Sequence, residues 1–437
     1  MAKGRLQVQV FRGDNYAPVS KSKVTITPTT GTSTKNIELN TDSSGLTQEI
    51  ELDTPPIEYS MRPTNQIPYG LYDIRIDAAN LNSQLIKGCQ VMPDRVALQN
   101  ANLTGTAQRQ QIIIEIQPNV QVGKYPPKIP EAPEKPAPSG PSGFVVLPEP
   151  EVPQYIVVHA GPPDSPAPNY TVRFIDYIKN VCSSEIFSTW SDSTIRANAL
   201  CIISFVLNRV YTEWYRGKGK DFTITNSTAF DQAFSFGRNI YKNISNIVDD
   251  IFTTYIKLPG RKQPLLTQFC DGKNVQCPGW LTQWGSKYLG DQGKTAPQII
   301  RSFYGSEVQF ATAQKVQGIP MSYPGYALRV GSTGIPVRTI QTYLNRISND
   351  YTAIPKVAVT GTFGTETRNS VQAFQKIFNI PVTGVVDYGT WYRISDIYVA
   401  VTKIAELRGE DFEDEGIFYP PIAYPDRPVP YIDYPQL

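Results

Sequence analysis

Glu185 is the carboxylate with the clearest chemical potential in this chain. It stands in the run VCSSEIFSTW (residues 181–190), among apolar and small residues and directly before a long apolar stretch. A carboxylate beside Ile186, Phe187 and Trp190 loses hydration, which disfavours its charged form and keeps a proton available near neutral pH. A carboxylic acid flanked by aromatic surface is a common arrangement in enzymes that cleave glycosidic bonds. The residue types therefore indicate a general acid.

The size and charge of the chain limit what kind of protein it can be. Its 437 residues are enough for about two to four domains, each with a core of its own. Lysine and arginine number 41 against 39 aspartate and glutamate, and 18% of residues are charged. A near-neutral chain lacks the electrostatic footprint of a nucleic-acid-binding protein, so no nucleic-acid partner is expected.

Neither a signal peptide nor a membrane span is expected from the apolar segments. The N-terminus, MAKGRLQVQV, alternates polar and apolar residues and lacks the continuous apolar core of a secretory signal. The longest apolar candidate, 197–210, is interrupted by Asn198, Ser204 and Asn208, whereas a membrane helix needs roughly 18 apolar residues. We therefore expect synthesis in the cytoplasm without a signal peptide.

Residues 1–118 carry the pattern of a β-sandwich domain. They lack tryptophan, and turn signals separate short alternating runs at 6–11, 24–27, 37–39, 46–52, 71–76 and 112–116. This spacing predicts a small antiparallel sandwich. The order LQVQV, TDSSGLT and PYGLYDIRI resembles the prealbumin-like or carboxypeptidase-regulatory type of domain, whose usual role is spacing or adhesion.

Two segments have a composition that does not support a hydrophobic core of their own. Residues 119–154 are expected to form a linker, because the ten prolines between positions 125 and 153 favour a stiff, extended chain. The tail, 409–437, is acidic at first and then rich in proline and tyrosine. Both segments are candidates for contact with another copy of the chain or an assembly partner, and a solvated tail is the alternative.

Residues 155–310 are rich in aromatic residues and predict a mixed α+β domain. Strands are expected at 156–158 and 265–269, and a short helix at 174–181. Residues 191–193 supply N-cap chemistry for a helix over 194–215 that is apolar on nearly every face, so it is expected at the centre of the domain. Apolar residues at helical spacing predict a further helix over 240–256.

Two runs of this central segment resemble one family. The run YIKNVCSSE (177–185), followed by Trp190 and IRANA (195–199), resembles the start of the stage II sporulation protein D family. A second resemblance, to the end of that family's domain, lies downstream. It consists of TQWGS (282–286), GK (293–294), II (299–300) and FYG (303–305). The resemblance implies a peptidoglycan lytic transglycosylase with one catalytic glutamate, which here is Glu185.

A single glutamate suffices for that reaction. A lytic transglycosylase protonates the glycosidic oxygen that leaves muramic acid, and then takes the proton of the same sugar's C6 hydroxyl, which closes an anhydro ring. Because the nucleophile belongs to the substrate, no second carboxylate is required. Hydrolases need a carboxylate pair, and if the reaction is hydrolysis, Asp176 and Asp192 are the candidate partners of Glu185.

Three further side chains are candidate substrate contacts. The rings of Trp190 and Trp284 can stack on sugars, and core packing is the equal alternative for each of them. Gln283 can hydrogen-bond a substrate or a buried backbone group. Glu185 itself has a structural alternative, as a charge favoured by the N-terminus of a helix.

The chain departs from the family pattern at two positions. Ile203 stands where the family has an arginine, and Cys277 stands where it has a histidine. Both changes remove polar groups from the expected cleft. A structural protein that keeps the fold without the activity is therefore a rival hypothesis.

The cysteines are weak candidates for a metal site. Some members of the family carry zinc in this region, and Cys270 and Cys277 form a Cys-x6-Cys pair. A zinc site needs about four ligands, and the chain has one histidine, His159. We expect no cofactor, with free thiols or one disulfide that closes a short loop as the favoured states.

Residues 320–400 contain the most specific resemblance. The runs LRVGSTG (328–334), VTGTFG (359–364), VQAFQ (371–375) and VTGVVD (382–387) resemble peptidoglycan-binding domain type 1. Apolar residues at helical spacing, with glycine turns between them, predict a three-helix module. The resemblance implies peptidoglycan as the partner.

Two functions therefore compete for a chain with a β-sandwich, an α+β domain and a three-helix module. The first is a peptidoglycan-binding, spore-associated lytic transglycosylase with Glu185 as acid and base. The second is a catalytically weak or inactive structural subunit of a spore-surface or cell-envelope assembly. The expected location is the spore coat, the cortex or the spore surface.

Overall fold

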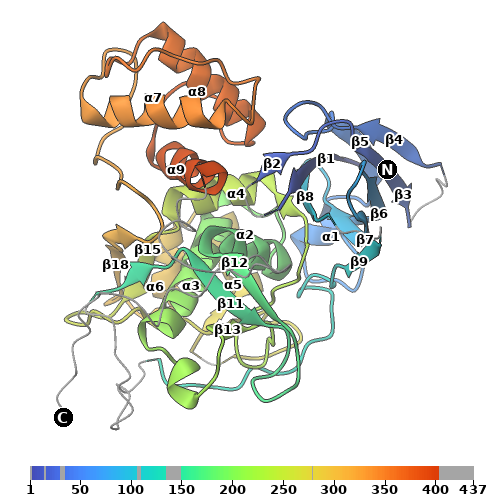
Figure 1. Ribbon diagram of the computed structural model, residues 1–437. Coiled ribbons are helices and arrows are strands. Elements are labelled where there is room, and N and C mark those ends of the chain that lie inside the picture. Colours follow the sequence, from blue (N-terminus) through green and yellow to red (C-terminus); the bar gives the residue numbers. More distant parts are fainter. Residues whose placement is uncertain are drawn as a thin grey trace.

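The computed structural model describes residues 2–13, 16–29, 35–105, 110–133, 149–277 and 279–402. Three parts follow one another along the chain (Figure 1): a sheet-rich N-terminal part, a central part of helices and short strands, and a C-terminal part of three helices. The tail expected at 409–437 and the stretch 134–148 of the expected linker lie outside the described residues.

Two five-stranded sheets form the N-terminal part. One contains β1 (Ala2–Arg12), β2 (Ala17–Pro18), β5 (Ile50–Thr54) and β8 (Val96–Leu103), and it also takes up β14 (Ile240–Tyr241) from the central part. The other has the order β4-β3-β6-β7-β9, with the bounds Ile37–Asn40, Lys23–Pro28, Gly70–Asp77, Ser83–Val91 and Gln111–Glu115. A short helix, α1 (Glu58–Met61), follows β5.

Alternating residues bury one face of these strands, as the period of two predicts. In β1, Leu6, Val8 and Val10 are fully buried. The expected antiparallel arrangement is wrong at two pairs, because β1 runs parallel to β8 and β7 runs parallel to β9. Alternation shows which face of a strand is buried but carries no information about the direction of its neighbour.

Helix α3 (Asp192–Tyr211) lies at the centre of the second part, and every residue from Ala197 to Tyr211 is buried. Ser191 caps its N-terminus by accepting the N–H of Thr194 at 3.4 Å. Four helices pack against α3, namely α2 (Phe174–Glu185), α4 (Lys242–Ile251), α5 (Gln283–Asp291) and α6 (Ala296–Tyr304).

Short sheets surround these helices. Strand β11 (Tyr155–His159) lies between β12 (Asn169–Arg173) and β13 (Ile224–Thr225), and a 3-10 turn spans Arg216–Lys218. Three pairs complete the part: β10 (Glu151–Val152) with β19 (Lys315–Val316), β15 (Thr254–Lys257) with β18 (Gln309–Thr312), and β16 (Phe269–Cys270) with β17 (Leu281–Thr282).

The helix predicted over 240–256 is shorter in the structure at both ends, so the predicted bounds are wrong. Residues 240–241 pair with β8 as strand β14, and after α4 the chain turns into β15, which pairs with β18. Tyr255 and Ile256 are aromatic and β-branched residues that suit a strand, and this pairing overrides the helical spacing of the apolar residues. The strand expected over 265–269 begins only at Phe269.

The C-terminal part consists of α7 (Ile335–Ile347), α8 (Thr365–Ile377) and α9 (Tyr388–Thr402). A glutamine of each of the first two helices holds the turn that leads into the next helix. Gln341 accepts the N–H of Gly361, and Gln375 accepts the N–H of Gly384, at 2.8 Å in both cases. Each glutamine also donates to a carbonyl of the same turn and to a threonine hydroxyl at the start of the next helix. The two turns are thus built in the same way.

The three-helix unit packs on the central part through α9 and α4 (Figure 1). A Cβ placed on Gly389 of α9 would lie 3.3 Å from the Cβ of Asp249 of α4, so the two helices approach closely at a residue without a side chain. Arg173 at the end of β12 forms an ion pair with Asp396 of α9. These contacts fix the position of α9.

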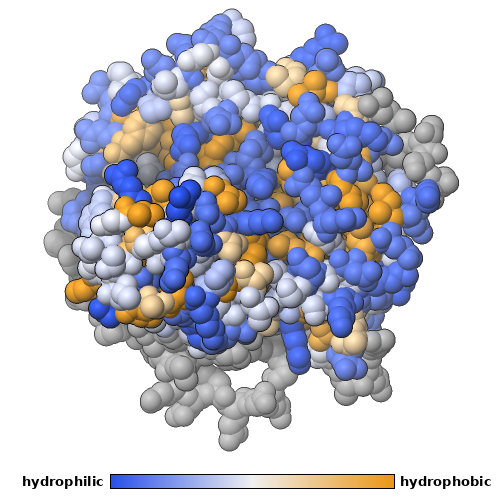
Figure 2. Space-filling view, turned by 90° about the horizontal axis from the view of Figure 1, so that it is seen from above, coloured by the Kyte–Doolittle hydropathy of each residue, from blue (hydrophilic) through white to orange (hydrophobic). Residues whose placement is uncertain are grey.

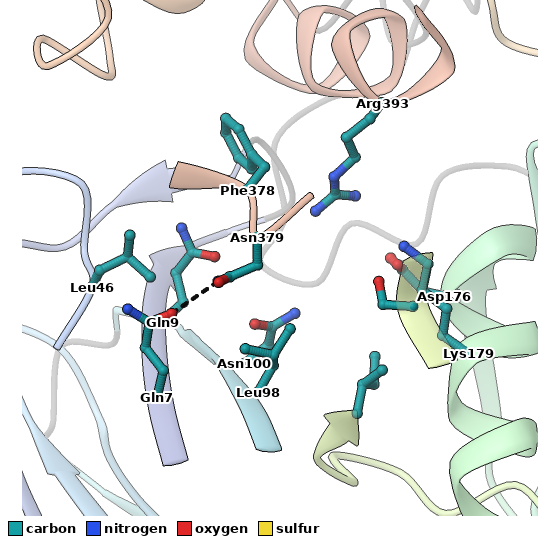
Figure 3. Close-up of a pocket in the computed structure, with 12 residues that line it drawn as sticks. Gln7, Gln9, Leu46, Leu98, Asn100, Asp176, Lys179, Phe378, Asn379 and Arg393 are labelled. Atoms are coloured by element: carbon teal, nitrogen blue, oxygen red, sulfur yellow. Dashed lines mark hydrogen bonds between the residues drawn. The ribbon is translucent and has the colours of Figure 1, made fainter. Parts of the chain in front are cut away.

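A polar pocket lies where the three parts meet (Figure 3). Gln7 and Asn100 come from the N-terminal sheet, Asp176 and Lys179 from α2, and Arg393 from α9. The Nδ2 of Asn379 donates to the side chain of Gln7 at 2.9 Å, which ties the three-helix unit to β1. The three parts are therefore joined at one point by polar side chains.

Among the helices of the described residues, none has the length and apolar character needed to cross a membrane. Seen from above, the surface is mainly hydrophilic and carries separate hydrophobic patches (Figure 2).

Candidate functional site

Glu185 is the last residue of α2, and α3 begins only at Asp192. Its side chain belongs to the interior, because the residue is 3% exposed. The interpretation of Glu185 as a charge at a helix N-terminus is therefore wrong. The C-terminal end of a helix carries partial negative charge, which disfavours a second negative charge there.

Two donors hold the carboxyl group of Glu185. The backbone N–H of Ala233 donates to Oε1 at 2.8 Å. The Nε2 of Gln283, the first residue of α5, donates to Oε2 at 2.9 Å, and Gln283 is fully buried. The structure thus brings together Glu185 and Gln283, two residues that the sequence singled out in separate runs.

Residues 119–133, which we call the strap, run along the central part and are bound to it. The Nδ2 of Asn119 donates to the carbonyls of Ser183 and Ile186 at 3.2 Å each, and so satisfies carbonyl groups at the end of α2. The Nε2 of Gln121 donates to the backbone carbonyl of Glu185 at 2.8 Å and to the Oε1 of Gln283. The start of the expected linker is therefore part of the surroundings of Glu185.

The other end of the strap is anchored to α3 and to the segment before β16. The side chain of Gln268 accepts the N–H of Glu131 and donates to the carbonyl of Ile129, at 2.9 Å in both cases. The carboxylate of Glu131 pairs with the guanidinium of Arg209. Because both ends are held, the strap keeps a defined position over the end of α2.

A pocket lies between the strap and Glu185, with about 420 Å³ of empty space, part of it open to solvent. Five strap residues form one wall, namely Val120, Gly123, Tyr125, Pro126 and Lys128. Thr228, Asp271 and Asn274 are among the residues of the other walls. The hydroxyl oxygen of Thr228 is buried and has no hydrogen-bond partner among the described residues.

Lys128 brings a positive charge to this pocket. Its Nζ donates to the backbone carbonyl of Asp231 and lies 4.7 Å from the ring centroid of Phe269. Burial lowers the pKa of Lys128, while the carboxylates of Glu185 and Asp231 raise it, and the net shift is downward. A partly buried ammonium near a buried carboxyl group can stabilise the ionised form of that group.

Burial is the largest influence on the proton affinity of Glu185, and it raises the pKa above the ordinary value of 4.5. The ammonium of Lys128 and the hydrogen bonds from Ala233 and Gln283 oppose this rise, and the charge of Asp271 adds to it. The net pKa is raised. Glu185 therefore holds its proton at a higher pH than an exposed glutamic acid, as a general acid requires.

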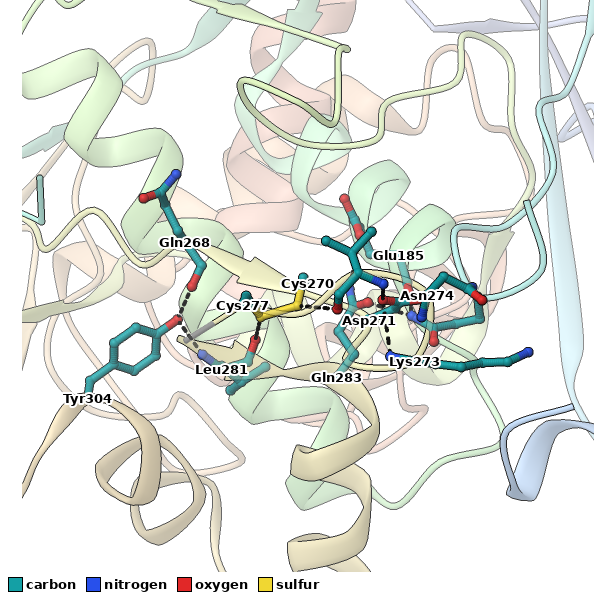
Figure 4. The surroundings of a disulfide bond; sticks show 12 residues. Glu185, Gln268, Cys270, Asp271, Lys273, Asn274, Cys277, Leu281, Gln283 and Tyr304 are labelled. Carbon is teal, nitrogen blue, oxygen red and sulfur yellow. Dashed lines mark hydrogen bonds between the residues drawn. A yellow bond between two sulfur atoms is a disulfide. The ribbon is translucent and has the colours of Figure 1, made fainter. Parts of the chain in front are cut away.

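Another part of the pocket lining comes from a loop closed by a disulfide between Cys270 and Cys277 (Figure 4). Asp271 organises this loop, because its carboxylate accepts the backbone N–H groups of Lys273, Asn274 and Val275 at 3.2, 2.9 and 2.9 Å. The loop is thus held by one covalent bond and three hydrogen bonds.

The expected zinc candidates are not free to bind a metal in this arrangement. Both thiols, of Cys270 and Cys277, are used by the disulfide. Within the described part of the chain, no group of three or more histidine, cysteine, aspartate and glutamate side chains is placed to hold a metal ion. His159 is instead stacked on Phe222, with ring centroids 4.6 Å apart. These residues do not fit a zinc site.

Trp190 and Trp284, the two candidate sugar-stacking tryptophans, pack against each other, with ring centroids 5.0 Å apart. Trp190 is 1% exposed, and its Nε1 donates to the backbone carbonyl of Ser60 in α1. Trp284 is partly buried, and neither ring lines the pocket. The two rings thus pack together in this arrangement, and their contact with a substrate stays a prediction.

Neither of the two alternative carboxylates lines the Glu185 pocket. Asp176 lines the pocket between the three parts and accepts the hydroxyl of Tyr16 at 2.9 Å. Asp192 is exposed at the start of α3. Ile203 is fully buried in α3 and does not line the Glu185 pocket, so that departure changes the core instead of the pocket.

Sequence reasoning missed Gln121, Lys128 and Ala233. Gln121 and Lys128 lie in or beside a proline-rich stretch whose composition predicts a spacer, and Ala233 contributes only a backbone N–H. The polar side chains of Gln121 and Lys128 are visible in the sequence, but their types do not indicate where the segment binds.

Comparison with known families identifies one module. Residues 333–394 match the family described as peptidoglycan binding domain. The match covers the whole of α7 and α8 and about the first half of α9, including both glutamine-held turns. A search of curated proteins finds no significant match to the chain. The C-terminal three-helix unit thus carries a peptidoglycan-binding domain, which supports peptidoglycan binding and association with the cell wall.

Proposed function

We propose that this protein cleaves glycan strands of peptidoglycan by lytic transglycosylation. The peptidoglycan-binding module is held against the central part, which contains Glu185. Binding is supported by the family match at residues 333–394. Cleavage is supported by the surroundings of Glu185 and by the resemblance of the runs before and after it to the stage II sporulation protein D family.

One observation carries the proposal: Glu185 is a buried carboxyl group that lines a pocket, and among the described residues no free carboxylate lines that pocket with it. Asp271 is the other described carboxylate of the pocket wall, and both of its oxygens accept N–H groups of its own loop. A hydrolase needs a second carboxylate as nucleophile or base. A transglycosylase does not, because the C6 hydroxyl of the substrate is the nucleophile.

The proposed reaction uses Glu185 twice. The protonated carboxyl gives its proton to the glycosidic oxygen as the bond from that oxygen to C1 of muramic acid breaks. The carboxylate then takes the proton of the C6 hydroxyl as O6 bonds to C1, so the products are a free sugar end and an anhydro sugar. Gln283, Ala233 and Lys128 stabilise the carboxylate between the two steps.

A second candidate is a catalytically weak or inactive structural subunit of a spore-surface or cell-envelope assembly. It is favoured by the low exposure of Glu185, 3%, because a catalytic acid must contact the glycan strand that it protonates. The spore setting rests on the family resemblance alone. Contacts between copies through the linker or the tail belong to the same proposal.

Purified peptidoglycan distinguishes the two candidates. The full chain, the Glu185→Gln variant and a control variant, Asp176→Asn, are incubated with it, and soluble products are analysed by mass spectrometry. We expect anhydromuropeptides from the wild type and from Asp176→Asn, and none from Glu185→Gln. All three proteins are expected to sediment with peptidoglycan. Binding without anhydro products at any pH between 4 and 9 would favour the structural candidate.

A further inference from the structure

A chain of two glutamines connects the strap to the carboxyl group of Glu185. Gln121 donates to Gln283, and Gln283 donates to the Oε2 of Glu185. We propose that Gln121 is a positioning residue, which sets the protonation state of Glu185 by fixing the orientation of the Gln283 amide. The role in catalysis rests on the proposed function, but the effect on protonation does not.

The orientation of both amides follows from one backbone group. The carbonyl of Glu185 can only accept, so the side-chain group of Gln121 that faces it at 2.8 Å must be the NH2. The same NH2 faces Gln283, which must therefore present its Oε1. The NH2 of Gln283 is then left to face Oε2 of Glu185. Without Gln121, the Gln283 amide could turn over and present its oxygen to Glu185.

The direction of the amide decides which form of Glu185 is stabilised. An NH2 group toward Oε2 stabilises the carboxylate, whereas an amide oxygen toward Oε2 stabilises only the protonated acid. Since burial already favours the protonated acid, the glutamine chain works against burial. Glu185 can then release its proton in the first step and exist as a carboxylate before the second.

Other ionisable groups face Glu185 and stay unchanged when Gln121 is replaced. They are Lys128 and Tyr125 from the strap, Asp271 from the disulfide loop, and Tyr177 and Cys182 from α2. Burial raises the pKa of both tyrosines and of the cysteine, so these three groups stay neutral near neutral pH. Lys128 and Asp271 are thus the charges that accompany Glu185 in every variant below.

The strap reaches this chain through a defined local structure. The side-chain oxygen of Asn119 accepts the N–H of Gln121 at 2.9 Å, while its Nδ2 binds the end of α2. Gln121 is 1% exposed. Its position is therefore set by the same helix end that carries Glu185, which makes the hydrogen-bond chain a closed loop of Glu185, Gln121 and Gln283.

The proposal is tested by the pKa of Glu185 in four full-length proteins: wild type, Gln121→Met, Gln283→Met and the double variant. Carboxyl-labelled glutamate followed by carbon NMR reports the pKa, and the signal missing from Glu185→Gln assigns the resonance. We expect Gln283→Met to raise the pKa by about one unit, as loss of a hydrogen bond to a charged group does. As a single substitution, Gln121→Met should also raise the pKa of Glu185. In the double variant it should add nothing to the pKa rise that Gln283→Met causes alone.

Two results would overturn the proposal. One is an unchanged pKa in Gln121→Met, and the other is an equal rise from Gln121→Met with and without Gln283. Gln121→Asn, which keeps the amide but shortens its reach, replaces Gln121→Met if the latter does not fold, as judged by thermal melting. A purely structural role for Gln121 would lower the melting temperature and leave the pKa in place. Absence of anhydro products with the expected pKa shifts would refute the proposed function alone.

Discussion

Arg209 and Glu131 form a two-point ion pair that fixes the far end of the strap. The Nη2 of Arg209 lies 2.6 Å from Oε1 of Glu131, and Nη1 lies 3.0 Å from Oε2. Arg209 is a fully buried residue of α3, and the Glu131 side chain is 13% exposed. The Nε of Arg209 also pairs with Asp231 at 2.8 Å. The strap thus supplies a charge that the core of the central part requires.

Replacing Glu131 by glutamine should loosen the strap. Arg209 keeps Asp231, so the expected loss in the free energy of unfolding is about 1 to 3 kcal/mol, less than for a wholly unpaired buried charge. Hydrogen exchange in 119–133 should increase. The matched control is Glu49→Gln, which breaks the Arg5–Glu49 pair between largely exposed side chains and should change stability little. Equal effects of the two substitutions would contradict this role for Glu131.

Glu185 should make the stability of the protein depend on pH in a direction opposite to most carboxylates. Its pKa is raised above 4.5 in the folded protein, so the folded state binds the proton more tightly than the unfolded state does. The resulting stabilisation is complete below about pH 4.5 and is lost as the pH rises through the folded pKa. Glu185→Gln should therefore become more stable relative to wild type as the pH increases across this window.

Denaturant unfolding of both proteins at a series of pH values measures this difference. Any constant cost of placing an amide beside Ala233 and Gln283 cancels in the pH dependence. A relative loss of stability of Glu185→Gln with rising pH would show that Lys128 and the two hydrogen bonds outweigh burial.

The disulfide between Cys270 and Cys277 should stabilise the protein and shape the pocket. Closing a loop between residues seven apart in sequence removes chain entropy from the unfolded state, worth about 2 to 3 kcal/mol in the simplest treatment. We expect a thiol reductant to lower the unfolding midpoint of the wild type by a corresponding amount. The Cys270→Ser/Cys277→Ser variant should show the lower midpoint with or without reductant. If the midpoint of this variant still falls on addition of reductant, the loss of stability does not come from this disulfide.

Gly389 should be required for the close contact between α9 and α4. A leucine there would meet Asp249, whose Cβ lies 3.3 Å from the position of a new Cβ, at a cost of about 1 to 3 kcal/mol. Small-angle scattering should detect a larger radius of gyration as the three-helix unit shifts. Gly364→Leu is the control, since nothing lies within 4 Å of a Cβ at that position. Unchanged scattering of Gly389→Leu would show that the contact adapts.

Local patterns in the sequence predict much of the fold. The alternation in β1 and the apolar surface of α3 are properties of neighbouring residues, and they correctly indicate a buried strand face and a central helix. Glycine turns and helical spacing likewise predict the three-helix unit whose family match is found at 333–394. Strands β7 and β8 were missed, because polar residues interrupt their apolar positions.

The sequence by itself made Glu185 the candidate for the chemistry, because its neighbours in the chain are apolar or small and lower its hydration. It also determined Gln283 as a candidate, through a separate run. Only the tertiary structure decided that these two side chains meet, that Trp190 and Trp284 pack together, and that the strap returns to Glu185 with Gln121 and Lys128. Hydrogen-bond partners so distant along the chain are selected by the packing of whole elements, and composition alone assigns a proline-rich segment no place to bind.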